Sequence, residues 1–117
     1  MNDRKLRRHY RAKFFTEVQA LNYPKGSQDK SNAKQLELVV LNLSIDGVGI
    51  LSKECIEKGS IVTFTLYLGG IGHEIMGYVT FCRKIGEMYR VGLKLVSPDN
   101  MFTSMLMSYI DNEKSES

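Results

Sequence analysis

Residues 60–68 read SIVTFTLYL, and this stretch gives the clearest secondary-structure signal in the chain. Apolar side chains alternate with threonine and tyrosine along it, since Val62, Phe64, Leu66 and Leu68 are separated by Thr63, Thr65 and Tyr67. Successive side chains of a β-strand point to opposite faces of the sheet. This period of two therefore predicts a strand with one face on a hydrophobic core.

Similar β-forming stretches lie on both sides of that strand. We predict five further strands, at residues 14–21, 35–43, 48–52, 74–83 and 88–96. Turn-forming residues separate several of them, with SIDG at 44–47, GGIG at 69–72 and IGE at 85–87. Strands that follow one another through short turns favour antiparallel pairing, and six of them commonly close into a small barrel.

Two longer connections are expected from their polar composition. Residues 22–34 contain Pro, Gly, Ser, Asn and Asp, and are predicted to form an exposed loop. Residues 52–59 are predicted to be turn-like, with room for one helical turn. His73 is expected at the end of the turn that precedes the strand at 74–83.

The apolar period changes near the C-terminus. The pairs Met101/Phe102, Met105/Leu106 and Tyr109/Ile110 recur every four residues, which predicts a helix over 98–112. Ser97 is predicted as the N-cap of this helix, with Pro98 at the first helical position. The fold class that we predict is all-β, a six-stranded antiparallel barrel with a C-terminal α-helix.

The 117 residues are the size of one domain, so we predict a single domain over residues 1–117. Its parts are a flexible basic head at 1–11, a barrel at 12–97 and the helix at 98–112. The methionine-rich helical stripe either covers the barrel or meets a second subunit, which leaves a monomer and a homodimer both open.

Positive charge is concentrated at the start of the chain. Residues 1–13 hold six basic residues and one acidic residue, or +5, so with a total of +3 the remainder sums to −2. A local cluster of arginines is suited to an anionic ligand. A nucleic-acid polymer is not expected as a partner, because RNA- or DNA-binding barrels usually spread basic and aromatic residues over one face.

Several other functions are not expected. His9 and His73 lack a nucleophile motif nearby, so we predict that the protein is not an enzyme. Cys55 and Cys82 have no CxxC spacing, and we interpret them as ordinary thiols, with no metal site and no cofactor.

No apolar run reaches the ~20 residues that span a bilayer. No signal peptide follows the basic start, so we expect a cytoplasmic protein without membrane insertion.

Two short polar motifs remain. The first is RRHYR at residues 7–11, which begins with Arg7 and ends with Arg11. Arg8 lies directly after the first arginine. Further along the chain, NLSIDG at 42–47 combines Asn42, Ser44 and Gly47 at the end of a predicted strand. Asparagine and serine supply hydrogen-bond donors and acceptors. Because Asn42 and Ser44 are two residues apart, their side chains would point to the same face of a strand. A glycine permits a turn that other residues resist. Each motif alone is also compatible with a solvated tail or a polar hairpin.

Taken together and in this order, the motifs resemble the PilZ domain family. The signature of that family is RxxxR followed by [D/N]xSxxG, and here RRHYR and NLSIDG match both parts. Arg4 and Arg8 also have the RxxxR spacing, but Arg7 and Arg11 lie closer to the first predicted strand. The resemblance spans about residues 4–112 and includes the barrel and the terminal helix.

The resemblance implies binding of the bacterial second messenger cyclic di-GMP. It implies as ligand-binding residues Arg7, Arg8, Arg11, Asn42, Ser44 and Gly47. We expect the ligand to order the basic head and so to change a surface seen by a downstream protein partner. The alternative is a PilZ-like adaptor that binds a partner protein without the nucleotide.

Overall fold

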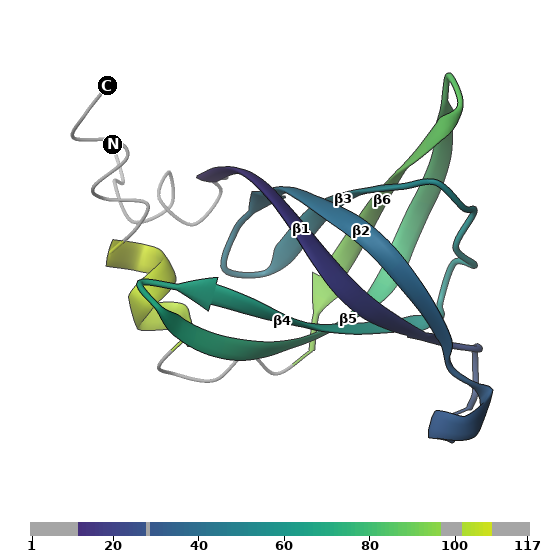
Figure 1. The fold of residues 1–117 in the computed structure, drawn as a ribbon, viewed down its shortest axis with the longest axis horizontal. Helices are drawn as coiled ribbons and strands as arrows, with labels where there is room; N and C mark the ends of the chain where they lie inside the picture. Colours follow the sequence, from purple (N-terminus) through teal and green to yellow (C-terminus); the bar gives the residue numbers. More distant parts are fainter. Residues whose placement is uncertain (1–11, 28, 97–101, 109–117) are drawn as a thin grey trace.

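The computed structural model describes residues 12–27, 29–96 and 102–108, and in residues 12–14 the backbone only. Six strands form a closed antiparallel barrel in the order β1-β2-β3-β6-β5-β4 (Figure 1). The strands are β1 (Ala12–Tyr23), β2 (Lys34–Leu43), β3 (Gly47–Ser52), β4 (Ile61–Leu68), β5 (Ile71–Ile85) and β6 (Met88–Leu95). Residues 102–108 are helical. The predicted fold class is therefore confirmed.

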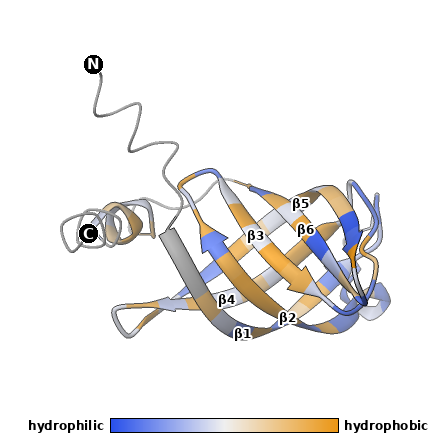
Figure 2. Ribbon diagram, turned by 90° about the horizontal axis from the view of Figure 1, so that it is seen from above, coloured by the Kyte–Doolittle hydropathy of each residue, from blue (hydrophilic) through white to orange (hydrophobic). Residues whose placement is uncertain are grey.

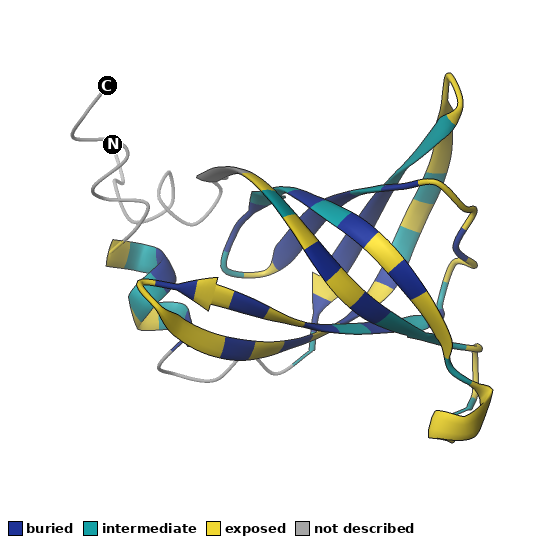
Figure 3. Cartoon of the chain, in the orientation of Figure 1, coloured by how far each residue is buried: buried dark blue, intermediate teal, exposed yellow. Residues whose placement is uncertain are grey.

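The interior of the barrel is filled mainly with aliphatic side chains. In β4, buried and more exposed residues alternate as predicted, with Val62 and Leu66 almost fully buried. A similar alternation runs along much of β2 and β5, whereas β3 is buried along almost its whole length (Figure 3). Hydrophobic residues are concentrated in the strands, whereas the loop that carries the 3-10 helix η1 (Lys30–Asn32) is hydrophilic (Figure 2). The interior is thus a packed core.

The described part of the C-terminal helix covers one end of the barrel. Phe102 and Leu106 are buried in the main core cluster, at 1% and 0% exposure. The ring of Phe102 meets that of His73 edge to face, with 5.5 Å between the ring centroids. The helix lies beside the turn between β4 and β5 (Figure 1). The predicted apolar stripe is therefore a packing surface for the barrel at these positions.

The β4–β5 turn is shorter than the sequence predicted. Leu68 pairs with Ile71, so only Gly69 and Gly70 form the loop, with φ of 58° and 81°. Two successive residues with positive φ are typical of a type I′ turn, which suits the twist of a hairpin. The expected position of His73 at the end of the turn is wrong. Two glycines suffice for the reversal, so His73 lies within β5 and is only 3% exposed.

The two polar connections also differ from expectation. β1 continues to Tyr23, and the 22–34 segment contains η1, whose N-cap is Asp29. The backbone N–H of Ser31 donates to Asp29, and this lowers the pKa of the carboxyl group. Residues 53–60 form no helical turn. Instead Ile56 turns inward and is 1% exposed, because the barrel end offers it an apolar site.

Ile56 therefore offers a test of how the β3–β4 connection stabilises the barrel. Ile56→Ala should lower the free energy of unfolding by about 2–5 kcal/mol, because it removes buried methyl groups and leaves a cavity. Chemical denaturation measures the change. Glu57→Ala, at the exposed neighbouring residue, is the matched control and should change stability little. A similar loss in both variants would contradict the inward packing of Ile56.

Candidate functional site

The NLSIDG motif forms the end of β2, a tight turn and the start of β3. Ser44 is 1% exposed, and its backbone N–H donates to the carbonyl of Gly47 at 2.9 Å. The Ser44 hydroxyl lies 2.9 Å from Asp46 Oδ1, to which it donates, and 3.3 Å from the carbonyl oxygen of Gly47. Ser44 thus closes the turn from within, while Asp46 is exposed.

Gly47 is buried at the start of β3 and does not have a positive φ. A positive φ is therefore not the reason for glycine at this position. The Ser44 hydrogen bonds close the turn. Gly47 pairs with Lys94 of β6, so the motif also contacts a third strand.

A β-bulge directs Asn42 to the outer surface. Val40 pairs with Ile50, but Asn42 pairs with Gly49, so Leu41 is an extra residue in β2. Because Leu43 is fully buried, Asn42 points away from the core. Its side-chain amide lies flat over β3. A methyl group on Gly49 would stand 2.6 Å from Asn42 Oδ1.

A similar arrangement on the next two strands was not predicted from the sequence. Gly92 of β6 pairs with Gly49, and the ring of Phe81 lies over Gly92. A methyl group on Gly92 would stand 2.2 Å from a carbon of that ring. The paired glycines thus bring the Asn42 amide and the Phe81 ring over neighbouring positions of the outer surface. Phe81 is 42% exposed, which leaves ring surface available to a ligand.

Two arginines lie beside this platform of Asn42, Gly49, Gly92 and Phe81. The guanidinium carbon of Arg83 lies 5.6 Å from the centre of the Phe81 ring. Arg83 and Arg90 are directly paired across β5 and β6, and like charges at such positions repel. The Nε of Arg90 is buried and has no hydrogen-bond partner among the residues that the structure describes. An anion bound here would relieve both costs.

The predicted arginines Arg7, Arg8 and Arg11 lie outside the described residues. The described chain begins at Ala12, which pairs with Leu43, and Lys13 pairs with Asn42. The strand that follows the RxxxR motif in the sequence therefore starts beside the strand that carries NxSxxG. The structure brings Asn42, Ser44 and Gly47 together at that end of the barrel.

Another concave surface lies over β1, β4 and β5. It encloses about 670 Å³ and is lined by Leu21, Tyr23, Thr63, Met76 and Val96, among others. Lys30 and Glu74 also line it, so its described charges are mixed in sign. Its described lining holds no arginine, although arginines are expected at a site for a dianion.

The described residues show neither a metal centre nor a membrane span. No group of three histidine, cysteine or acidic side chains could hold a metal ion within the part of the chain that the structure describes. In the same residues, no helix is long and apolar enough to cross a membrane.

The fold and this surface define a small antiparallel barrel whose polar and aromatic platform lies on the outside. The model of the PilZ domain family matches residues 5–111. The chain belongs to the PilZ domain family, a family of cyclic di-GMP receptors. PilZ domains are binding and adaptor domains, and no catalytic family is indicated.

Among solved structures, the chain is similar to the Bacillus subtilis inhibitor of motility (MotI/DgrA), with a TM-score of 0.62 at 10% sequence identity. The alignment covers 91% of this chain and 50% of that one, so the chain spans about half the length of that neighbour. At this identity the likeness shows the fold alone. The comparison with curated proteins gives no match.

The contact between Phe81 and Gly92 can be tested by a double-mutant cycle. Gly92→Ala should lower the free energy of unfolding by about 1–3 kcal/mol, because the new methyl group displaces the ring. In a Phe81→Ala background the same change should be almost neutral, since no ring remains to be displaced. Chemical denaturation of the wild type, the two single variants and the double variant gives the coupling free energy between the two positions. Equal losses in both backgrounds would contradict the platform.

Proposed function

We propose that this chain is a receptor for cyclic di-GMP whose ligand lies on the outer surface of the barrel. The observation that carries this proposal is the PilZ family match over residues 5–111 in a chain that holds both RRHYR and NLSIDG. The register supports it, because the start of β1 is paired with the strand of NxSxxG. The described chain thus begins, one residue after Arg11, beside the strand that leads into the NLSIDG motif.

Each motif residue has a distinct role in the proposal. Arg7 and Arg11 supply guanidinium groups that bind phosphate oxygens or the O6/N7 edge of guanine in pairs of hydrogen bonds. Arg8 adds a phosphate contact. Asn42 presents its amide to a base, while Ser44 and Gly47 hold the turn that fixes Asn42 at the surface. Lysine would supply charge but neither the fork nor the stacking plane of arginine.

The platform extends this site toward β5. A guanine is flat and stacks on aromatic and guanidinium planes. Phe81, with Arg83 above its ring, offers such a plane next to Asn42. Arg90 lies two residues from Gly92 along β6, opposite Arg83, and supplies positive charge for a phosphate. We therefore include Phe81, Arg83 and Arg90 in the proposed site.

The proposed mechanism is ordering of the head by the ligand. The head, residues 1–11, holds five basic residues and one acidic residue, so its basic groups repel one another. A bound anion would offset this repulsion and allow the head to fold against the barrel. Cyclic di-GMP supplies two phosphate charges and would hold the head against β2 and β3. The resulting surface, made of head and barrel together, would be recognised by a downstream protein partner.

Calorimetric titration with cyclic di-GMP tests the binding proposal. We expect saturable binding that Arg11→Ala and Arg7→Ala each weaken about 10–100-fold, the effect of losing a charge-assisted pair of hydrogen bonds. Lys58→Ala is the control, because it removes one exposed positive charge from the β3–β4 connection, outside the NLSIDG motif, and should bind as wild type does. An absence of binding in the wild type would favour the adaptor that acts without nucleotide.

A second variant tests the position of Asn42 without removing it. Gly49→Ala should displace the Asn42 amide, since the added methyl group would stand 2.6 Å from Oδ1. The amide ends a flexible side chain, so thermal stability should change little while affinity for cyclic di-GMP falls. Calorimetric titration measures the affinity, and thermal unfolding measures the stability of the same variant. Unchanged affinity would place the ligand elsewhere.

Ordering of the head has its own measurement. Backbone amide NMR shifts of residues 4–11 should change on saturation with cyclic di-GMP, and their resonances should gain the relaxation behaviour of the barrel. Shifts in residues 42–49 report binding itself. If residues 42–49 respond and residues 4–11 do not, the ligand binds without ordering the head, and the mechanism is wrong.

A further inference from the structure

Cys55 and Cys82 are 27 positions apart in the sequence but adjacent in the structure. The thiol of Cys82 donates to Cys55 Sγ, and the two sulfur atoms are 3.7 Å apart. Both cysteines are free. Cys55 lies in the β3–β4 connection, while Cys82 lies on β5, near the hairpin that projects past the other strands (Figure 1).

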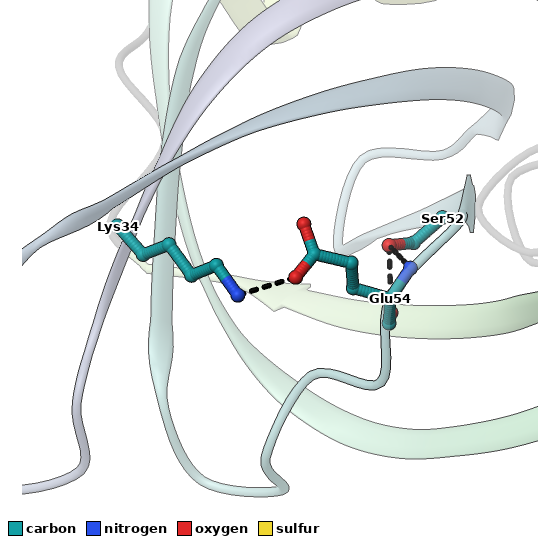
Figure 4. Close-up of polar contacts among 3 residues, drawn as sticks. All are labelled: Lys34, Ser52 and Glu54. Atoms are coloured by element: carbon teal, nitrogen blue, oxygen red, sulfur yellow. Dashed lines mark hydrogen bonds and ion pairs between the residues drawn. The ribbon is translucent and has the colours of Figure 1, made fainter.

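The residues on both sides of Cys55 are held in place. Ser52 Oγ donates to the carbonyl of Glu54 at 2.7 Å and accepts its N–H at 3.0 Å, and Glu54 forms an ion pair with Lys34 (Figure 4). On the other side, Ile56 is buried and its backbone N–H donates to Cys82 Sγ at 3.4 Å. The connection therefore keeps Cys55 beside Cys82 in the folded protein.

The two thiols differ in accessibility. Cys55 is exposed, whereas Cys82 is half-buried and packs against the core. Burial raises the pKa of the Cys82 thiol, and the neighbouring Cys55 adds to the rise, although the hydrogen bond from Ile56 opposes it. Cys55 is therefore the thiol that an oxidant in solution reaches first.

We propose that Cys55 and Cys82 form a thiol-oxidation site, which closes to an intramolecular disulfide on reaction with a small-molecule disulfide such as oxidised glutathione. A disulfide requires a sulfur–sulfur distance of about 2.05 Å. The two sulfur atoms, 3.7 Å apart, therefore have to approach by about 1.7 Å. This inference does not depend on the proposed nucleotide binding.

The reaction is two successive thiol–disulfide exchanges. The Cys55 thiolate attacks one sulfur of oxidised glutathione, forms a mixed disulfide and releases one glutathione. The Cys82 thiolate then attacks the Cys55 sulfur, forms the protein disulfide and releases the second glutathione. Two electrons pass from the cysteines to the oxidant, and the two thiol protons end on the released glutathione molecules.

The disulfide would tie the β3–β4 connection to the β5–β6 hairpin. Residues 55–82 would become a covalently closed loop, which restricts the unfolded chain and stabilises the folded one. The link also lies next to Phe81 in the sequence, so it would fix β5 beside the platform. The oxidised protein should therefore be more stable and more rigid at this end than the reduced protein.

Mass spectrometry of the full chain in glutathione buffers of increasing oxidised fraction tests the site. After alkylation of free thiols, we expect one species that has lost two hydrogen atoms, carries neither alkyl group nor glutathione, and yields a Cys55–Cys82 cross-linked peptide. Its midpoint of thermal unfolding should exceed that of the reduced protein by at least about 5 °C.

Single-cysteine variants are the controls. Cys82→Ser should retain a mixed disulfide with glutathione at Cys55, because no second thiol resolves it. Cys55→Ser should remain largely free at Cys82, and circular dichroism checks that both variants fold. Wild-type protein that keeps glutathione at Cys55, joins two chains through a disulfide, or stays fully reduced throughout the range would overturn the proposal.

Discussion

The barrel closes through one short ladder, in which β1 pairs with β4 over four residue pairs, from Ala20↔Phe64 to Tyr23↔Ile61. Without it the sheet would have two open edges with unpaired backbone groups. The side-chain amide of Asn22 reinforces the ladder by donating to Ser60 Oγ at 3.0 Å and to the Ile61 carbonyl at 3.1 Å. Closure encloses the aliphatic core and leaves the outer surface as the place for recognition.

Local irregularities of the strands shape that outer surface. Regular alternation from Leu38 and Val40 would point residue 42 inward, and the bulge at Leu41 reverses this for Asn42. In β5, the shift at Thr80 leaves Val79 inside and directs Phe81 outward. The paired glycines Gly49 and Gly92 then give both side chains space to lie flat. Bulges and glycines, rather than loops, therefore build the platform.

The sequence predicted the architecture well because it depends on periodicity, which is local. Alternation in residues 60–68 and the four-residue stripe around Phe102 are visible without any tertiary information. The bulges are not, because Leu41 and Thr80 carry no composition that marks an extra residue. The NxSxxG motif was found from the resemblance, but the register that adds Phe81 and Gly92 depends on pairing between strands. The adjacency of the two cysteines likewise depends on where the β3–β4 connection crosses β5.

β5 also explains how one strand serves two surfaces. Consecutive residues of a strand face opposite sides, so Phe81 is directed to the platform while Cys82 is directed to the core and the β3–β4 connection. A backbone movement that changed the position of one would move the other, since only one peptide unit separates them. The projecting hairpin has no β4 partner beyond Tyr78, so its backbone is held on fewer sides than the rest of β5. Contacts at Cys82 and at Phe81 therefore act on the same lightly supported segment, and each helps to determine the geometry available to the other.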